Sequence, residues 1–186
     1  MNRRQFLIAL AVLVVLAGAG AAIVLSERSA WKSADSRAGQ KLIADLRIDQ
    51  VAEIGIRDAA GELHLVRDEA GWSVRERGGF AAETDRVAER LVKLAELKIV
   101  QSEALPEEQR ARLELVEPKD KAQGAGTLLE LKDPKGATLA RLLLGKKIMK
   151  SAAVASPSRG QSEATGRYLS KGGDAGTMLV VPEPLA

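Results

Sequence analysis

The fold class follows from three consecutive segments: Val51-Ala-Glu-Ile-Gly-Ile-Arg57, Glu62-Leu-His-Leu-Val-Arg67 and Gly71-Trp-Ser-Val-Arg75. In each segment apolar and polar residues alternate at a period of two, which places successive side chains on opposite faces of a β-strand. The residues expected to face inward are Ala52, Ile54, Ile56, Leu63, Leu65, Trp72 and Val74. The pattern therefore predicts three half-buried strands.

Two short connections, Asp58-Ala-Ala-Gly61 and Asp68-Glu-Ala-Gly71, separate these strands. Aspartate at the first position of a turn can accept hydrogen bonds from the backbone that follows, and glycine at the fourth position tolerates a positive φ. Connections this short join neighbouring antiparallel strands. Residues 51–75 are therefore predicted to form a three-stranded antiparallel meander.

The period changes at Thr84–Leu97, where four apolar residues share one face of a helix: Val87, Leu91, Leu94 and Ala95. Thr84 is a suitable N-cap, and Asp85 suits the positive end of the helix dipole. We predict one main helix here, followed by a short strand at 98–102. A second, shorter helix is expected to open with Pro106, because proline is tolerated at the first helical position.

A second group of strands follows. Thr127-Leu-Leu-Glu-Leu-Lys132 and Thr138-Leu-Ala-Arg-Leu-Leu-Leu144 flank the turn Asp133-Pro-Lys-Gly136. The Ser/Ala/Gly-rich stretch 146–166 is either a loop or a ragged hairpin, and closing strands are expected at 167–170 and 177–181. The order of elements echoes the first group, including one aromatic residue in each half (Trp72, Tyr168). The predicted fold class is α+β: antiparallel β-meander units packed on one main helix, with a weak β-unit duplication.

The N-terminus differs from the rest of the chain. Phe6 to Leu25 is an uncharged run of 20 residues, and a helix of that length spans about 30 Å, the thickness of a bilayer core. Arg3 and Arg4 precede it, and the first acidic residue is Glu27. Because positive charge stays on the cytoplasmic side, we predict a single-pass protein of the cytoplasmic (inner) membrane. Its N-terminus is expected inside and its C-terminal domain in the extracytoplasmic (periplasmic) space.

This interpretation has two alternatives. The small residues Ala17-Gly18-Ala19-Gly20-Ala21-Ala22 could supply the cleavage site of a secretory signal. The start Arg3-Arg4-Gln5-Phe6-Leu7 also resembles a twin-arginine export signal. A retained anchor is favoured because the apolar run continues through Leu25, past the small residues.

The expected organisation has four parts. Residues 1–25 form the transmembrane anchor or an uncleaved signal, residues 26–45 a juxtamembrane linker, residues 46–181 the extracytoplasmic α+β domain, and residues 182–186 a tail. Gln40–Leu46 is expected to be a short helical lead-in to that domain.

Charge and cysteine content argue against several classes of partner and site. The formal charge is +3, from 28 Lys+Arg and 25 Asp+Glu. Without Arg3 and Arg4, 26 basic residues remain against 25 acidic residues, so residues 26–186 carry a formal charge of +1. These charges are interspersed, which is typical of a solvated surface and argues against nucleic acid as a partner. The chain has no cysteine, which excludes disulfides and cysteine-ligated metals.

The chain resembles the bacterial membrane-anchored proteins that carry the domain DUF4340, from about Leu46 to Val181. The segments that carry the resemblance are Val51-Ala-Glu-Ile-Gly-Ile, Leu65-Val-Arg, Gly71-Trp72, Gly79-Phe-Ala-Ala, Leu115-Val-Glu-Pro118, Leu139 to Gly145 and Tyr168-Leu169. The resemblance implies an extracytoplasmic α+β domain. Some members of the family occur beside ABC-type export or gliding-motility components, which implies an accessory role. It supplies no catalytic residues.

No residue set predicts catalysis, a cofactor or a metal. His64 is the single histidine, and it is expected to be a partly exposed strand residue without the partners of a triad or zinc site. The turns at Asp58, Asp68 and Asp133 lack the ligand array of a calcium loop. Other motifs are assigned structural roles: Gly78-Gly79, Gly124-Ala-Gly126, Gly172-Gly173, Glu107-Glu108, and Lys146, Lys147 and Lys150, expected on a solvated loop.

Two functions are consistent with these features. The leading hypothesis is a non-catalytic accessory or adaptor that binds other membrane or envelope proteins, such as an ABC-type transport complex, with residues 6–25 in the bilayer. The alternative is an extracytoplasmic module that binds a small ligand, a glycan or lipid. Trp72, Phe80 and Tyr168 would be its contacts if they were exposed.

Overall fold

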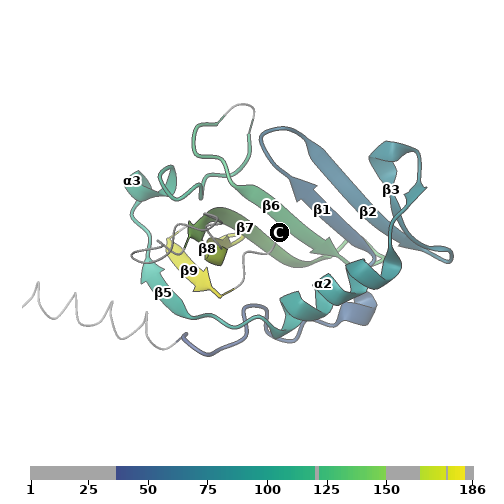
Figure 1. The fold of residues 1–186 in the computed structure, drawn as a ribbon, viewed down its shortest axis with the longest axis horizontal. Helices are drawn as coiled ribbons and strands as arrows, with labels where there is room; N and C mark the ends of the chain where they lie inside the picture. Colours follow the sequence, from purple (N-terminus) through teal and green to yellow (C-terminus); the bar gives the residue numbers. More distant parts are fainter. Residues whose placement is uncertain (1–36, 120–121, 150–163, 175, 183–186) are drawn as a thin grey trace, which may run out of the picture. The chain divides into compact units, whose positions relative to one another are not determined.

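The computed structural model describes residues 37–119, 122–149, 164–174 and 176–182. They belong to a compact unit, Arg37–Ala186, built on one antiparallel sheet (Figure 1). Among the described residues the sheet has nine strands, in the order β4-β3-β2-β1-β6-β7-β8-β9-β5. The coarse α+β prediction is therefore confirmed. No helix in the described ranges is long and apolar enough to span a bilayer, and the predicted anchor, residues 6–25, lies outside them.

The first meander forms as predicted. It comprises β1 (Glu53–Arg57), β2 (Glu62–Asp68) and β3 (Gly71–Val74), with the two-residue strand β4 (Phe80–Ala81) added at its edge. The Asp58 carboxylate accepts hydrogen bonds from the backbone N–H of Ala60 and Gly61, at 2.7 and 2.9 Å. The Asp68 carboxylate accepts one from Ala70 at 2.8 Å. Turn chemistry therefore fixes both connections.

The second group of strands comprises β6 (Thr127–Lys132), β7 (Thr138–Met149), β8 (Ala164–Lys171) and β9 (Thr177–Val181). It joins the first meander through the antiparallel pair β1–β6. Of the two alternatives for 146–166, the hairpin is correct at its base, since Met149 pairs with Ala164. The register shifts between Leu144 and Lys147, which makes this hairpin ragged. Residues 150–163 lie outside the described ranges.

The main helix, α2 (Thr84–Glu96), lies over one face of the sheet (Figure 1). Leu91 and Leu94 are its buried residues. The core beneath it draws on β1, β6, β7, β8 and β9, and its least exposed members are Leu42, Val51, Leu131, Leu142, Leu169, Leu179 and Val181. The predicted N-cap was wrong: Glu83 occupies that position, without a side-chain cap. The Thr84 hydroxyl instead accepts a 3.5 Å hydrogen bond from the backbone N–H of buried Trp72.

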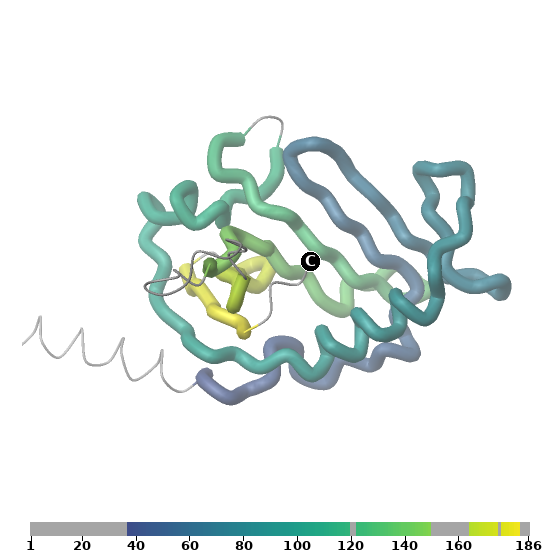
Figure 2. Tube along the Cα trace, viewed as in Figure 1, coloured from purple at the N-terminus to yellow at the C-terminus, as the bar shows by residue number. Residues whose placement is uncertain are grey.

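The segment before β1 differs from the prediction. Gln40–Leu46 forms turns rather than a helix, and the nearest helical turn is η1 (Ile48–Gln50). Leu42 is fully buried, and its N–H donates to the Leu97 carbonyl at 2.7 Å. Figure 2 shows this segment running alongside α2. The compact unit therefore begins at Arg37.

A second core occupies the opposite face of the sheet. Its buried residues are Leu105, Leu115, Leu128, Leu143 and Met178. Leu128 and Leu143 pair with each other, and their neighbours Leu129 and Leu142 belong to the first core. Alternation along each strand thus sends consecutive leucines to opposite faces. The cover on this second face is the short helix α3 (Glu107–Arg110) and the segment after it.

The strand predicted at 98–102 is shifted in the structure to β5 (Gln101–Ala104). Ile99, which lies before it, is buried in the first core, and its N–H donates to the Gln40 carbonyl at 2.9 Å. The backbone of Ile99 therefore bonds to the segment around Gln40 and not to a neighbouring strand of the sheet. The second helix begins at Glu107, with Pro106 as its N-cap rather than its first residue.

Candidate functional site

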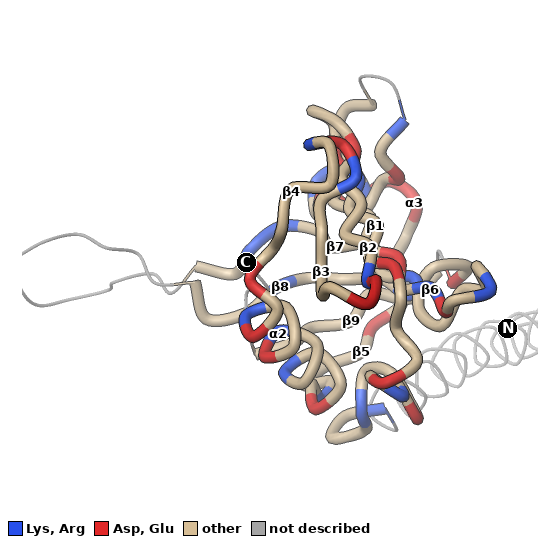
Figure 3. The backbone as a smooth tube through the Cα atoms, turned by 90° about the vertical axis from the view of Figure 1, so that its right-hand side faces the viewer, with Lys and Arg blue, Asp and Glu red and all other residues tan. Residues whose placement is uncertain are grey.

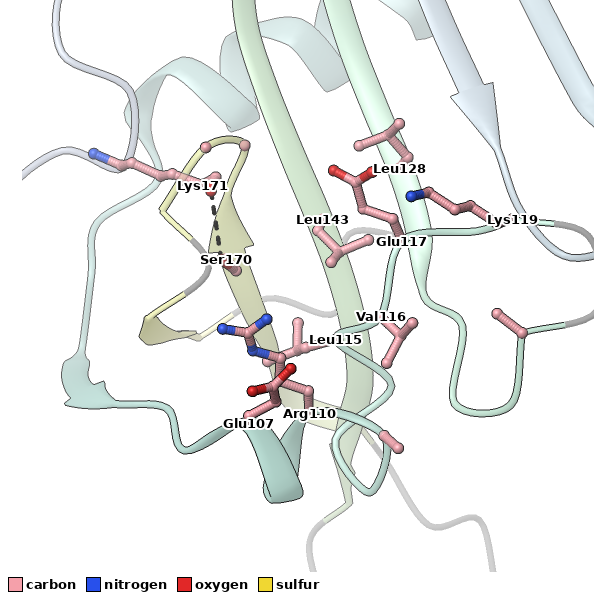
Figure 4. Close-up of a pocket in the computed structure, with 14 residues that line it drawn as sticks. Glu107, Arg110, Leu115, Val116, Glu117, Lys119, Leu128, Leu143, Ser170 and Lys171 are labelled. Carbon is pink, nitrogen blue, oxygen red and sulfur yellow. Dashed lines mark hydrogen bonds between the residues drawn. The ribbon is translucent and has the colours of Figure 1, made fainter.

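A pocket of about 390 Å³ lies beside the second core (Figure 4). Its walls come from α3, from residues 115–117, 119 and 122, from β6 and β7, and from the end of β8 with the turn that follows it. Leu115, Leu128 and Leu143 form an apolar floor, and all three are buried. The volume is within the range of small-molecule sites, roughly 300–1,000 Å³.

Close backbone approaches build this pocket. The segment after α3 crosses β7, where the Lys146 N–H donates to the Leu113 carbonyl at 2.9 Å. The Leu115 N–H donates to the Arg110 carbonyl at 2.8 Å. Gly126 and Gly145 lie where this segment meets the sheet, and a Cβ at either position would overlap a backbone carbonyl. Glycine therefore allows α3 and the following residues to cover the second face.

Arg110 is the most distinctive residue of the pocket (Figure 4). In the described part of the chain, its Nε is buried and has no hydrogen-bond partner. A buried guanidinium N–H without an acceptor is unfavourable, because it has lost water without gaining a replacement. A carboxylate or phosphate oxygen would satisfy it, and guanidinium groups bind both in a bidentate manner.

The other charged groups favour an anion as well. Lys119 and Lys171 also line the pocket, together with Glu107 and Glu117. Glu117 forms a 3.1 Å ion pair with Arg141, which offsets its charge. Buried Ser170 donates its hydroxyl hydrogen to the Asp174 carbonyl at 2.7 Å, so its oxygen can accept but not donate toward a ligand. Three cations against the one remaining carboxylate, Glu107, and an apolar floor suit a ligand with an anionic group on a small apolar body.

His64 lies on the same face of the sheet, outside this pocket. Its Nδ1 is 2.6 Å from Glu76 Oε1, and its Nε2 is 3.3 Å from Glu62 Oε1 and 4.0 Å from Glu53 Oε1. Glu53 also pairs with Arg75 at 2.9 Å and with Lys132 at 3.4 Å. The His64 side chain is 17% exposed, as expected for a partly exposed strand residue. No group of three or more described His, Asp or Glu residues is arranged to hold a metal.

These contacts set the acidity of two carboxyl groups. The backbone N–H of His64 donates to Glu76 at 2.7 Å, and this bond, with the His64 ring, lowers the pKa of Glu76 to about 2. Burial raises the pKa of Glu53, but the hydrogen bonds and charges of Arg75 and Lys132 outweigh it, so that this pKa lies below its ordinary value. Both carboxylates are therefore ionised at neutral pH and bind their partners as anions.

A pH-dependent loss of stability follows for Glu76. A carboxyl group whose pKa falls on folding stabilises the protein fully above its unfolded value of 4.5, and this contribution is lost as the pH falls toward 2. We expect Glu76→Gln to lower the melting temperature at pH 7 and the difference from wild type to shrink between pH 4.5 and pH 2. Near-UV circular dichroism of the full-length chain measures both. The control is Glu69→Gln, an exposed residue of the turn between β2 and β3; a difference independent of pH would contradict the assignment.

The three aromatic residues expected as ligand contacts do not meet. Trp72 is 4% exposed in the first core, whereas Tyr168 packs against the second core on the other face. Phe80 is 71% exposed on β4, at the edge of the sheet. They therefore cannot line one groove. Lys146 and Lys147 lie on β7 rather than on a loop, and Lys150 lies outside the described residues.

Nothing in the sequence distinguishes Arg110 or Lys171 from the other basic residues. In the sequence, Arg110 is one of several basic residues near the end of a short helix. Only the approach of the β8–β9 turn to α3 gives it a pocket. The sequence did contain one sign of the pocket. Apolar residues occupy both odd and even positions of β6 and β7, which indicates a sheet covered on both faces. Comparisons of the chain with protein families, with curated proteins and with solved structures found no match.

Proposed function

We propose that the chain is a single-pass membrane protein whose extracytoplasmic α+β unit is a non-catalytic binding module. Its ligand is a small molecule that joins a carboxylate or phosphate group to an apolar body. The observation that carries this proposal is the buried, unpartnered Nε of Arg110 above a floor of leucines. The uncharged run 6–25 supports the anchor, and the resemblance to DUF4340 proteins supports the extracytoplasmic location.

Each part of the pocket has a distinct task in this proposal. Arg110 binds the anionic group through hydrogen bonds that water does not already make. Lys119 and Lys171 add positive charge at the rim, where solvent weakens their attraction. Leu115, Leu128 and Leu143 contact the apolar body. Binding of this kind needs no nucleophile, general base or metal.

Titration with a simple amphiphile tests the proposal. We expect hexyl phosphate to bind the full-length chain and Arg110→Gln to weaken this binding by about tenfold, the effect of losing one charge-assisted hydrogen bond. Isothermal titration calorimetry measures both affinities. Arg112→Gln is the matched control, since Arg112 is exposed and does not line the pocket. Hexanol should bind more weakly, and Arg110→Gln should leave its affinity unchanged.

A second candidate function is the adaptor for an envelope or ABC-type transport complex. It is favoured by Phe80, a large exposed ring on an edge strand, because exposed edges and rings are common protein contacts. Co-purification in mild detergent separates the two functions. A chain that binds no hexyl phosphate but co-purifies with a transport complex would overturn the ligand-binding proposal and support the adaptor.

A further inference from the structure

A second cavity lies on the other face of the sheet, between α2 and strands β1, β2, β6 and β7. It is a groove of about 330 Å³. The helix contributes Val87, Leu91 and Leu94, and the sheet contributes isoleucines and leucines that include Ile56 and Leu129. Among the lining residues of the sheet, Thr127 is the one with a polar side chain.

This groove is open rather than filled. Leu91 and Leu94 are buried, but Val87, Ile56, Leu65 and Leu129 are only partly buried although they pack against the first core. In Figure 1, β6 and β7 extend beyond the span that α2 covers. Partly exposed aliphatic side chains that line one groove of a folded unit are unfavourable in water and are typical of a binding surface.

Three cations border the groove along one side of α2: Arg86, Arg90 and Lys93. Their spacing of four and three residues aligns them in one row, next to the apolar row of Val87, Leu91 and Leu94. Figure 3 shows that charges of both signs are interspersed on the unit, α2 included. The acidic partners lie on the helix itself or just before it: Arg86 pairs with Glu83, and Lys93 pairs with Glu89 at 2.9 Å.

Arg90 differs from its two neighbours. It forms no ion pair with any carboxylate in the described part of the chain. Arg90 is exposed and lines the groove. The exposed pairs of Arg86 and Lys93 are weak, so both can exchange their partner for a ligand. The groove thus combines an aliphatic interior with a free cation at its edge.

We propose that this groove binds the alkyl chain of a long-chain fatty acid, with its carboxylate on Arg90. Apart from Thr127, the sheet residues that line the groove are aliphatic, which fits an unbranched alkyl chain and disfavours a glycan. Arg90 sets the charge of the head group, because its guanidinium attracts a carboxylate and repels a cationic amphiphile. This site is separate from the pocket beneath α3 and does not depend on its function.

Photo-crosslinking tests the groove. The probe is palmitic acid with a diazirine in its alkyl chain, added to the full-length chain in nanodiscs, and labelled residues are mapped by mass spectrometry. We expect labels on Val87, Leu91 or Leu129, and competition by unlabelled palmitate. A diazirine-bearing hexadecyltrimethylammonium ion of equal chain length should label these residues far less.

Variants decide the role of Arg90. Arg90→Glu should lower groove labelling by about tenfold and leave the melting temperature unchanged, because Arg90 is exposed. Arg77→Glu, an exposed arginine outside the groove, is the matched control. Val87→Trp should fill the groove and lower labelling while Arg90 is intact. The proposal is overturned by equal labelling from the cationic probe, by labels only outside the groove, or by cross-links that join two copies through it.

Discussion

Leu42→Ala is expected to lower the free energy of unfolding by about 2–5 kcal/mol, the range for deleting a buried leucine side chain. Leu42 has 0% exposure and belongs to the core beneath α2, although it lies in a segment of turns. Its backbone N–H donates to the Leu97 carbonyl, and the Gly39 N–H donates to the Ile99 carbonyl at 2.8 Å. Alanine keeps these backbone bonds, so the loss measures the side chain alone.

The neighbouring residue supplies the control for this prediction. Lys41→Ala keeps the same backbone pairing with Lys98 but removes an exposed side chain. It should change stability by no more than about 0.5 kcal/mol. Urea unfolding of the full-length chain, followed by near-UV circular dichroism, compares the two variants. If Leu42→Ala were as neutral as Lys41→Ala, residues 37–45 would belong to the juxtamembrane linker predicted at 26–45 and not to the folded unit.

Local patterns in the sequence predicted the strands well. Residues 127–132 and 177–181 were predicted as strands, and β6 and β9 have those bounds. Asp133 accepts hydrogen bonds from Lys135 and Ala137, both at 2.8 Å, which fixes the turn between β6 and β7. Strand alternation and turn chemistry act within a few residues, so the sequence alone reveals them.

Contacts between distant segments were not predictable in the same way. The pair β1–β6 joins residues more than 70 positions apart, and no local pattern encodes such a partner. That pairing places Gly55 between His64 and Glu130, and a Cβ there would lie 3.5 Å from the His64 ring. The carboxylates around His64 and the pocket around Arg110 both depend on such pairings. The candidate site was therefore less predictable than the fold class.

Gly145→Ala is expected to destabilise the chain by about 1–3 kcal/mol, because it overpacks the contact between β7 and the segment after α3. A Cβ at this position would overlap the Leu113 carbonyl oxygen and lie 2.8 Å from Leu115 Cδ2. The Leu113 carbonyl accepts the 2.9 Å hydrogen bond from Lys146 that holds this segment on the sheet. Moving it would also displace Leu115, a floor residue of the α3 pocket. Affinity for hexyl phosphate should therefore fall together with stability.

Gly61→Ala is the matched glycine control. Gly61 lies in the turn between β1 and β2, where an added Cβ meets nothing within 4 Å and φ is not in the left-handed region. Replacing a glycine at such a position with alanine can stabilise the chain by up to about 1 kcal/mol, because the substitution lowers the conformational entropy of the unfolded chain. Urea unfolding should show a lower free energy of unfolding for Gly145→Ala and an equal or higher one for Gly61→Ala. This result would place the strain where the segment after α3 crosses β7. Equal changes in the free energy of unfolding would mean that the segment after α3 shifts to accommodate the added Cβ without loss of stability. The pocket floor would then not depend on Gly145.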